Sequence, residues 1–216
     1  MTWLKAAIVF FAGMYCISAY ALDSVQREPI NRLTPIYKIP DLESKDRDAW
    51  QQPERVLDAF GVKEGDTVAD MGAGSGYFTF RLAKRIGGTG KVYAVDIQQE
   101  MLDYIRNKME RNGVENIVPV KSTETNTNLP PDCCNKVLLA ECYLELSKPV
   151  ELMKDLRNAL EPGGEVAIID KNSGEKGPPL KWRVPREVVI KQMKEAGYRL
   201  VKTYDFLKYQ YFLVFQ

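Results

Sequence analysis

The stretch VADMGAGSGYF, from Val68 to Phe78, decides the fold of this 216-residue chain. It starts as a short apolar strand, carries glycines at positions 72, 74 and 76, and runs into the amphipathic helical pattern YFTFRLAKRIG. Glycines between a strand and a helix let a ligand approach the backbone N–H groups of the helix N-terminus, because no Cβ stands in the way. A tight turn, a dinucleotide cradle and a cradle for another nucleoside are the three explanations, and they predict different residues downstream.

The rest of the chain repeats this alternation of strand and helix. Further strands are predicted at GKVYAVDI, NIVPVKS, NKVLLAECYLE and EVAIID, and a single helix is predicted at DRDAWQQPERVLDAFGV. Strands that are hydrophobic throughout and alternate with helices favour a parallel sheet covered on both faces. The last two strands, RLVKTYDFL and YQYFLVFQ, have only a few residues between them, so they must pair antiparallel. The sequence therefore predicts an α/β fold with a Rossmann-like, doubly wound, mostly parallel sheet that ends in an antiparallel hairpin.

An acidic residue after the second strand separates the three explanations. Asp96 lies 20 residues beyond Gly76, where its carboxylate can accept hydrogen bonds from two ribose hydroxyls, and Ile97 beside it can pack on a purine. The dinucleotide fingerprint is G-x-G-x-x-G, whereas this chain has Tyr77 in the position of the third glycine. We therefore expect an adenosine-containing ligand. A glycine-rich turn that serves only helix–strand packing is the alternative.

The pattern acid-x-G-x-G-x-G, with Asp70 as its acid, resembles the first motif of the class I S-adenosylmethionine-dependent methyltransferases. Asp96 is similar to their ribose-binding acid, and LEPGGEVAIID is similar to the turn before their fifth strand. The resemblance covers about residues 45–216 and implies their seven-stranded sheet, in which the last strand is inserted antiparallel.

Within that superfamily the chain most resembles small bacterial methyltransferases of unassigned substrate, some of them exported. These carry DR..W..P ahead of the first motif, which is seen here as Asp46-Arg47, Trp50 and Pro53. Their fourth strand usually ends in a Tyr-His pair, and Leu144 stands in the place of that histidine.

The resemblance implies S-adenosyl-L-methionine as the cofactor and a small molecule as the methyl acceptor. The expected cofactor-binding residues are Asp70, Gly72, Gly74, Gly76, Asp96, Ile97 and Thr123. Glu141 and Tyr143, at the tip of the fourth strand, are the candidate catalytic residues, with Glu145 and Asp170 near them. A solvated carboxylate is the alternative for Glu141, and core packing is the alternative for Tyr143. No metal is expected.

Three other functions stay open at this point. Leu144 in place of a histidine is compatible with a catalytically impaired module that binds adenosine or S-adenosylmethionine without turnover. The GSGY sequence is shared with protein carboxyl (isoaspartyl-type) methyltransferases. An NAD-dependent oxidoreductase is disfavoured by the glycine spacing and by the terminal hairpin.

The N-terminal segment is typical of an export signal. Lys5 precedes an apolar run, and Ala19-Tyr20-Ala21 has the small-x-small form of a cleavage site. The run is shorter than the ~20 residues that a membrane-spanning helix needs. We therefore expect a signal peptide at 1–21, an extended N-terminal arm at 22–45 and a methyltransferase domain at 46–216. The protein is expected to be exported to the periplasm without stable membrane insertion, and an uncleaved membrane anchor is the alternative.

Composition excludes several other classes. The net charge is +1, and removing residues 1–21 leaves 29 basic against 29 acidic residues, so no global field attracts nucleic acid. The chain has no histidine, which removes Ser-His-Asp, Cys-His and histidine-ligated metal chemistry. Adjacent Cys133 and Cys134 bridge only with strain, and Cys142 is expected on the same extended strand as Cys134, so free thiols are predicted.

Overall fold

The computed structural model describes residues 33–172 and 183–216. Contacts divide the chain between Asn31 and Arg32, so the described residues belong to a single unit. The expected signal peptide and the first part of the expected arm lie outside the described residues. Within the described ranges, no helix combines the length and the apolar character that crossing a bilayer requires.

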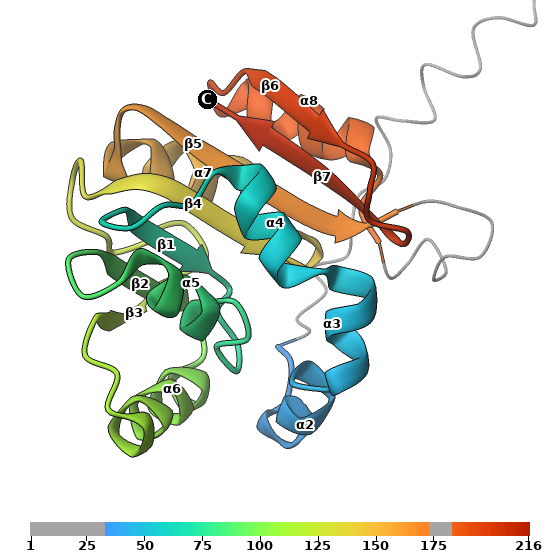
Figure 1. Cartoon of the computed structure of the whole chain (residues 1–216). Coiled ribbons are helices and arrows are strands. Elements are labelled where there is room, and N and C mark those ends of the chain that lie inside the picture. Colours follow the sequence, from blue (N-terminus) through green and yellow to red (C-terminus); the bar gives the residue numbers. More distant parts are fainter. Residues whose placement is uncertain (1–32, 173–182) are drawn as a thin grey trace, which may run out of the picture. The chain divides into compact units, whose positions relative to one another are not determined.

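One sheet of seven strands forms the centre of the described part (Figure 1). Its order is β3-β2-β1-β4-β5-β7-β6, and the pairs from β3 to β5 are parallel, whereas β7 pairs antiparallel with both β5 and β6. The strands are β1 Thr67–Met71, β2 Lys91–Asp96, β3 Ile117–Lys121, β4 Cys134–Ala140, β5 Leu160–Lys171, β6 Leu200–Tyr204 and β7 Gln210–Phe215. The predicted fold class, including the terminal hairpin, is confirmed. Strand order reverses between β1 and β4, the place where open α/β sheets bind ligands.

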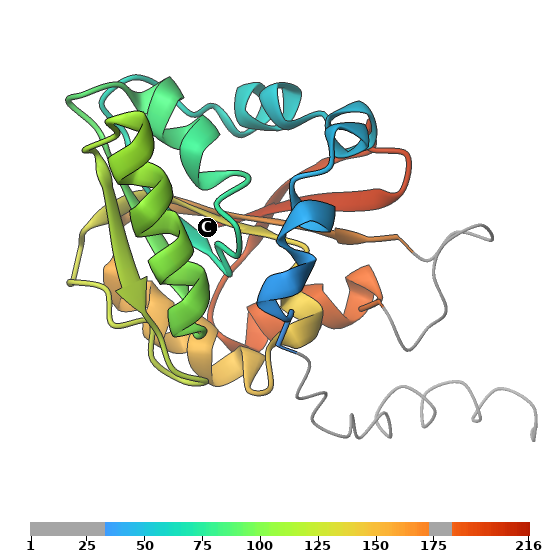
Figure 2. The ribbon, with the colours of Figure 1, turned by 90° about the horizontal axis from the view of Figure 1, so that it is seen from below.

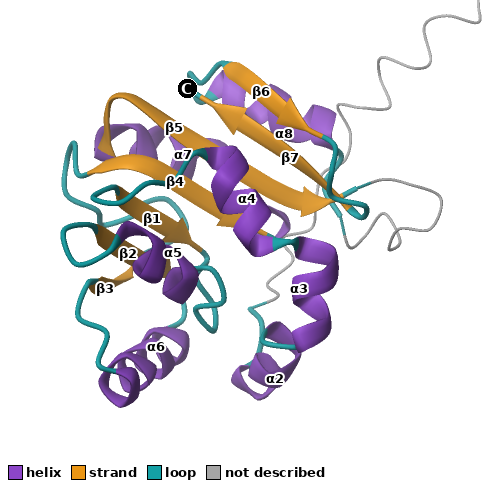
Figure 3. Cartoon of the chain, in the orientation of Figure 1, coloured by secondary structure: helices purple, strands orange, loops and turns teal. Residues whose placement is uncertain are grey.

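Helices cover both faces of this sheet (Figures 2 and 3). The helices of one face are α4 Pro53–Phe60, α5 Thr79–Ile86 and α6 Gln99–Asn112, and those of the other are α7 Pro149–Leu156 and α8 Arg186–Glu195. Alternate strand residues enter the two cores, since Val68 packs with the first set of helices and Ala69 with the second. This alternation explains why strands buried on both faces are apolar at nearly every position.

The described part of the N-terminal arm is helical, so the prediction of an extended arm is wrong there. A 3₁₀ turn, η1 Ile36–Lys38, leads into the short helix α2 Ile39–Leu42. Pro40 lies in the first turn of α2, where a missing N–H leaves no hydrogen bond unmade. Ile39 is buried, and its burial fastens this segment to the rest of the unit.

The predicted single helix before β1 consists of two helices, α3 Lys45–Gln51 and α4. Gln52 separates them, with a left-handed φ of 48°. A residue before proline is disfavoured in the α-helical region, because the ring of Pro53 crowds its backbone, so the helix breaks there.

The fourth strand is also shorter than predicted. It ends at Ala140, Glu141 takes a left-handed φ of 61°, and a 3₁₀ turn, η2 Tyr143–Glu145, follows. Cys134 and Cys142 therefore do not share one extended strand. Cys133, Cys134 and Cys142 are nevertheless free thiols, as predicted. A last 3₁₀ turn, η3 Arg157–Ala159, joins α7 to β5.

Candidate functional site

Different structural features require glycine at the three positions after β1. Gly72, Gly74 and Gly76 all have positive φ, at 69°, 53° and 82°. A Cβ on Gly72 would lie 2.5 Å from the Cβ of Cys142, and a Cβ on Gly76 would lie 2.9 Å from the ring of Phe80. A Cβ on Gly74 would meet nothing closer than Leu42 Cδ1 at 3.7 Å. Packing accounts for two of the three glycines, whereas at Gly74 an added Cβ would make ordinary van der Waals contact with Leu42, and only the left-handed φ requires glycine.

Asp96 is fixed at the carboxyl end of β2, beside Gly74. Gly74 donates its backbone N–H to Asp96 Oδ2 at 2.8 Å, and Gln98 donates its backbone N–H to Oδ1 at 2.8 Å. The side chain is buried, and burial raises its pKa. Each carboxylate oxygen keeps a lone pair for a further donor, as two ribose hydroxyls would require. Ile97 follows it with 37% of its surface exposed, the right position for stacking on a purine.

Asp70, the acid of the first motif, lies under the glycine loop. It is buried, and its Oδ2 accepts a hydrogen bond from Thr79 Oγ1 at 2.6 Å. Burial raises the pKa of Asp70 to about 7, although Thr79 and the Arg47 cation oppose that rise. A buried carboxyl of this kind favours a cation beside it.

Thr123 lies in the exposed loop after β3, where its hydroxyl accepts the backbone N–H of Asn126 at 3.0 Å. Its neighbour Ser122 is buried and donates its backbone N–H to Asp96 O at 3.0 Å. The end of β3 is thereby tied to Asp96 through Ser122. Sequence reasoning missed Ser122, although its place at a strand end was a usable signal.

The tip of β4 holds the candidate catalytic residues. Glu141 is half-buried, donates its backbone N–H to Ile169 O at 2.8 Å, and accepts a hydrogen bond on Oε1 from Gln210 Nε2 at 2.9 Å. Tyr143 is only 1% exposed and packs in the core beside α7 and α8, which fits the packing alternative. Cys142 donates its thiol to Met71 O, and burial raises its pKa well above the usual range, so it is no nucleophile.

Two further polar residues converge on Glu141 from β5 and β7. Asp170, at the end of β5, is 2% exposed, and burial raises its pKa to about 6. Gln210, the first residue of β7, is 1% exposed and pairs with Lys171 across the sheet. Sequence reasoning missed Gln210, because the register of the hairpin that places it beside β5 is set by tertiary pairing.

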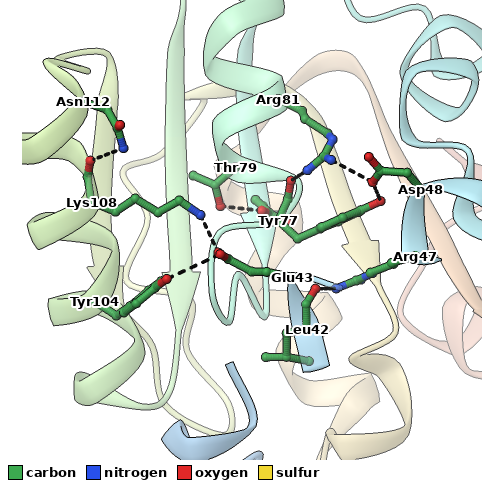
Figure 4. Close-up of polar contacts among 11 residues, drawn as sticks. Leu42, Glu43, Arg47, Asp48, Tyr77, Thr79, Arg81, Tyr104, Lys108 and Asn112 are labelled. Atoms are coloured by element: carbon green, nitrogen blue, oxygen red, sulfur yellow. Dashed lines mark hydrogen bonds and ion pairs between the residues drawn. The ribbon is translucent and has the colours of Figure 1, made fainter. Parts of the chain in front are cut away.

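Helix α3 is fastened over the glycine loop through Tyr77 (Figure 4). The guanidinium groups of Arg47 and Arg81 lie 3.9 Å and 4.0 Å from the centre of its ring. Its hydroxyl donates to Asp48 Oδ1 at 2.5 Å, and Arg81 pairs with the same carboxylate at 2.8 Å. We call Arg47, Asp48, Tyr77 and Arg81 the clasp.

A second set of contacts ties the end of α2 to α6 (Figure 4). Lys108 forms an ion pair with Glu43, and the Tyr104 hydroxyl donates to the same carboxylate at 3.4 Å. Between these contacts and the clasp lies a cavity of about 220 Å³, lined in part by Ser44 and Phe80. The N-terminal helices are therefore held to the cofactor side of the sheet at two points.

The geometry agrees with what comparison with known proteins finds. Residues 68–164 match the family model described as a methyltransferase domain. The crystal structure of an S-adenosylmethionine-dependent methyltransferase from Aquifex aeolicus is similar over 85% of this chain and 98% of that one, with 33% identity and a TM-score of 0.80. The chain belongs to the S-adenosylmethionine-dependent methyltransferases.

Relatives of known activity have lower identity. The 2-phytyl-1,4-beta-naphthoquinone methyltransferase of Arabidopsis thaliana is 28% identical over 187 residues, which cover 83% of this chain and 70% of that protein. The ubiquinone/menaquinone biosynthesis C-methyltransferase UbiE of Vibrio campbellii is 26% identical over 116 residues, 53% of this chain. The match spans only 45% of that enzyme's length.

S-adenosylmethionine is the cofactor of this methyltransferase, as predicted, and the residues present fit it. Asp96 is held by the Gly74 N–H, and its remaining lone pairs suit the hydroxyls of a ribose. Four carboxyl groups, those of Asp70, Asp96, Glu145 and Asp170, act electrostatically on Cys142, so they lie around the carboxyl ends of β1 and β4, where Cys142 contacts Met71. Carboxylates in that number suit the positive sulfonium and ammonium groups of the cofactor.

Proposed function

We propose that this methyltransferase acts on a small molecule bound beyond the carboxyl ends of β4 and β5, beside the cofactor. One observation carries the proposal. Glu141, which follows β4, meets Asp170 of β5 and Gln210 of β7 at the edge of the sheet where the glycine loop and Asp96 also lie. Their convergence supports an acceptor site there, because parallel sheets place their ligands outside the carboxyl ends of the strands.

The cofactor is assigned to the residues around the glycine loop. In this proposal the backbone of Gly72, Gly74 and Gly76 faces the cofactor's amino-acid part, Asp70 faces its ammonium group, and Asp96 accepts from the ribose. Ile97 packs on one face of the adenine, and Thr123 lies nearest its edge. The clasp keeps α3 over this side and excludes water from it.

The bound cofactor supplies a methyl group on a positively charged sulfur, which is already a strong electrophile. The protein's task is to hold the acceptor atom in line with that methyl group and to keep water away. Glu141 orients the acceptor and receives the proton that the acceptor gives up. Tyr143 shapes the site from the core.

The names of the relatives suggest which methyl acceptors to test first. The Arabidopsis and Vibrio relatives carry quinone substrates in their names, so we propose naphthalene-type and benzene-type ring compounds as first candidates. We also propose export to the periplasm, on the residues Lys5 and Ala19-Tyr20-Ala21.

Methyl transfer from methyl-labelled S-adenosylmethionine by the full chain tests the proposal. Small ring acceptors are compared with an isoaspartyl peptide. Label on a small molecule, with the rate lowered roughly 100-fold in Glu141→Gln and cofactor affinity unchanged, is expected if that carboxylate takes the proton. Label on the peptide alone would contradict the small-molecule proposal. Cofactor binding without label on any acceptor would contradict retained catalysis.

A further inference from the structure

We propose that the methyl acceptor carries a second hydrogen-bond donor, a hydroxyl or an amine, and that the Gln210 amide oxygen accepts from it. This rests on the proposed function and deepens it by naming a substrate class. Gln210 is then a specificity-determining residue, because it recognises a group of the acceptor other than the atom that is methylated.

The orientation of the Gln210 amide is fixed by its neighbour. An ionised carboxylate only accepts hydrogen bonds, so the NH₂ group of the amide must face Glu141, where Nε2 lies 2.9 Å from Oε1. The amide oxygen therefore points away from Glu141. It is buried in a side chain that is only 1% exposed, and it has no hydrogen-bond partner among residues 33–172 and 183–216.

A buried amide oxygen without a partner is costly in a folded protein, on the order of 1–3 kcal/mol. Such a cost is tolerated where a ligand supplies the missing donor, and a site built this way rejects analogues that lack the donor. The site already described lies next to this oxygen, because Gln210 touches Glu141, the proposed acceptor-orienting residue.

The surrounding charges favour donors as well. Asp170 interacts electrostatically with the carboxyl groups of Glu141 and Glu145 and with the cation of Lys171. The Arg47 cation is already engaged, since it donates to Gln51 and to Leu42 O and stacks on Tyr77. Three carboxyl groups, those of Glu141, Glu145 and Asp170, thus lie close together, and that of Glu141 contacts Gln210. A carbonyl group, which only accepts, would find no partner in the Gln210 oxygen.

Binding to the full-length protein saturated with the demethylated cofactor product tests this inference without turnover. The probes share one skeleton: 1,4-dihydroxynaphthalene, its monomethyl ether, 1,4-diaminonaphthalene and 1,4-naphthoquinone, titrated calorimetrically without oxygen. We expect the diol or the diamine to bind about 10-fold more tightly than the monoether, which corresponds to one hydrogen bond, and more tightly than the quinone. Whichever of the diol and the diamine binds more tightly shows whether the second donor is a hydroxyl or an amine.

Variants test whether Gln210 causes the preference for the diol over the monoether. In Gln210→Met the ratio of diol to monoether affinity should fall to about 1, while cofactor affinity stays the same. Gln210→Glu, which keeps an acceptor oxygen, should keep the preference. Gln216→Met is the matched control, because Gln216 follows the other end of β7 and is exposed.

Three results would overturn the inference: a quinone bound at least as tightly as the diol, no donor-bearing probe bound to the cofactor-saturated protein, or an unchanged ratio in a folded Gln210→Met. Failure of the wild-type protein to bind the cofactor product would instead count against the proposed function.

Discussion

Gly72 joins the cofactor loop to the acceptor side of the site. Its positive φ of 69° and the 2.5 Å separation between a Cβ there and Cys142 make two separate demands for glycine. Gly113, with φ 62° and nothing within 4 Å of a Cβ, makes only the first demand. The two positions therefore separate backbone strain from steric overlap.

Gly72→Ala is expected to lower the free energy of unfolding by roughly 2–4 kcal/mol, the sum of left-handed strain and overpacking. Gly113→Ala should cost only about 1–2 kcal/mol, from strain alone. Urea denaturation of the two variants measures the difference. Equal losses of unfolding free energy in the two variants would show that the Cys142 side chain moves aside without energetic cost. That result would contradict the tight contact.

Asp70 should make stability depend on pH. Its pKa rises from the ordinary value of 3.8 to about 7 in the fold, because burial outweighs the opposing effects of the Thr79 hydrogen bond and the Arg47 cation, while Asp96 adds to the rise. The folded protein therefore holds a proton that the unfolded chain has released, and stability is lost as the pH rises from about 4 through about 7. The loss is on the order of 4 kcal/mol at most.

Asp70→Asn should remove the part of this pH dependence that comes from Asp70 and leave the part that comes from Asp96 and Asp170, whose pKa values burial also raises. Stability measured in urea from pH 4 to 8 checks the difference between the variant and the wild-type protein. The same pKa predicts that the positive cofactor binds more tightly above pH 7 than below it, and that the variant lacks this trend. A wild-type protein whose stability rises over this range would contradict a raised pKa.

At the scale of the element, α3 depends on the clasp. Arg47 is buried against Tyr77 and joins α3 to the loop that holds Gly74. Arg85 makes a comparable link on the same face, to Glu54 and Asp58 of α4, but belongs to no part of the site.

Arg47→Met should weaken cofactor binding about 10-fold, since a desolvated cation–π contact contributes about 1–2 kcal/mol and holds α3 in place. Arg85→Met should leave cofactor affinity unchanged. Calorimetry gives the affinities, and hydrogen exchange of α3 shows whether the helix has loosened. Equal affinities in both variants would mean that α3 takes no part in holding the cofactor.

Elements were predictable where periodicity is strong, and less so at their ends. The long helix α6 and the apolar strands follow from pattern alone. The break at Gln52 was missed although Pro53 signals it in the sequence. The end of β4 at Ala140 did not follow from the pattern, because the left-handed backbone of Glu141 depends on tertiary contacts. The cofactor residues cluster in one sequence motif, whereas Gln210 reaches the site only through the pairing of β7 with β5.

At the scale of the whole molecule, the order of the sheet places the two halves of the reaction on either side of one crevice. The glycine loop follows β1 and Asp96 ends β2, whereas Glu141 follows β4, Asp170 lies in β5 and Gln210 begins β7. The antiparallel insertion of β7 is needed for this, because it brings Gln210 to the edge where the parallel strands end. We infer that the glycine loop and Asp96 bind S-adenosylmethionine, with Asp96 as the residue that binding requires.

Calorimetric titration of the full chain with S-adenosylmethionine, its demethylated product and NAD tests that claim most directly. We predict micromolar binding of the first two and at least 100-fold weaker binding of NAD. In Asp96→Ala affinity should fall roughly 100-fold or more, through the loss of charged hydrogen bonds. Asp103→Ala, on the exposed face of α6, should bind like the wild-type protein. A folded protein that binds neither form of the cofactor, or an Asp96→Ala variant that binds both unchanged, would contradict the account.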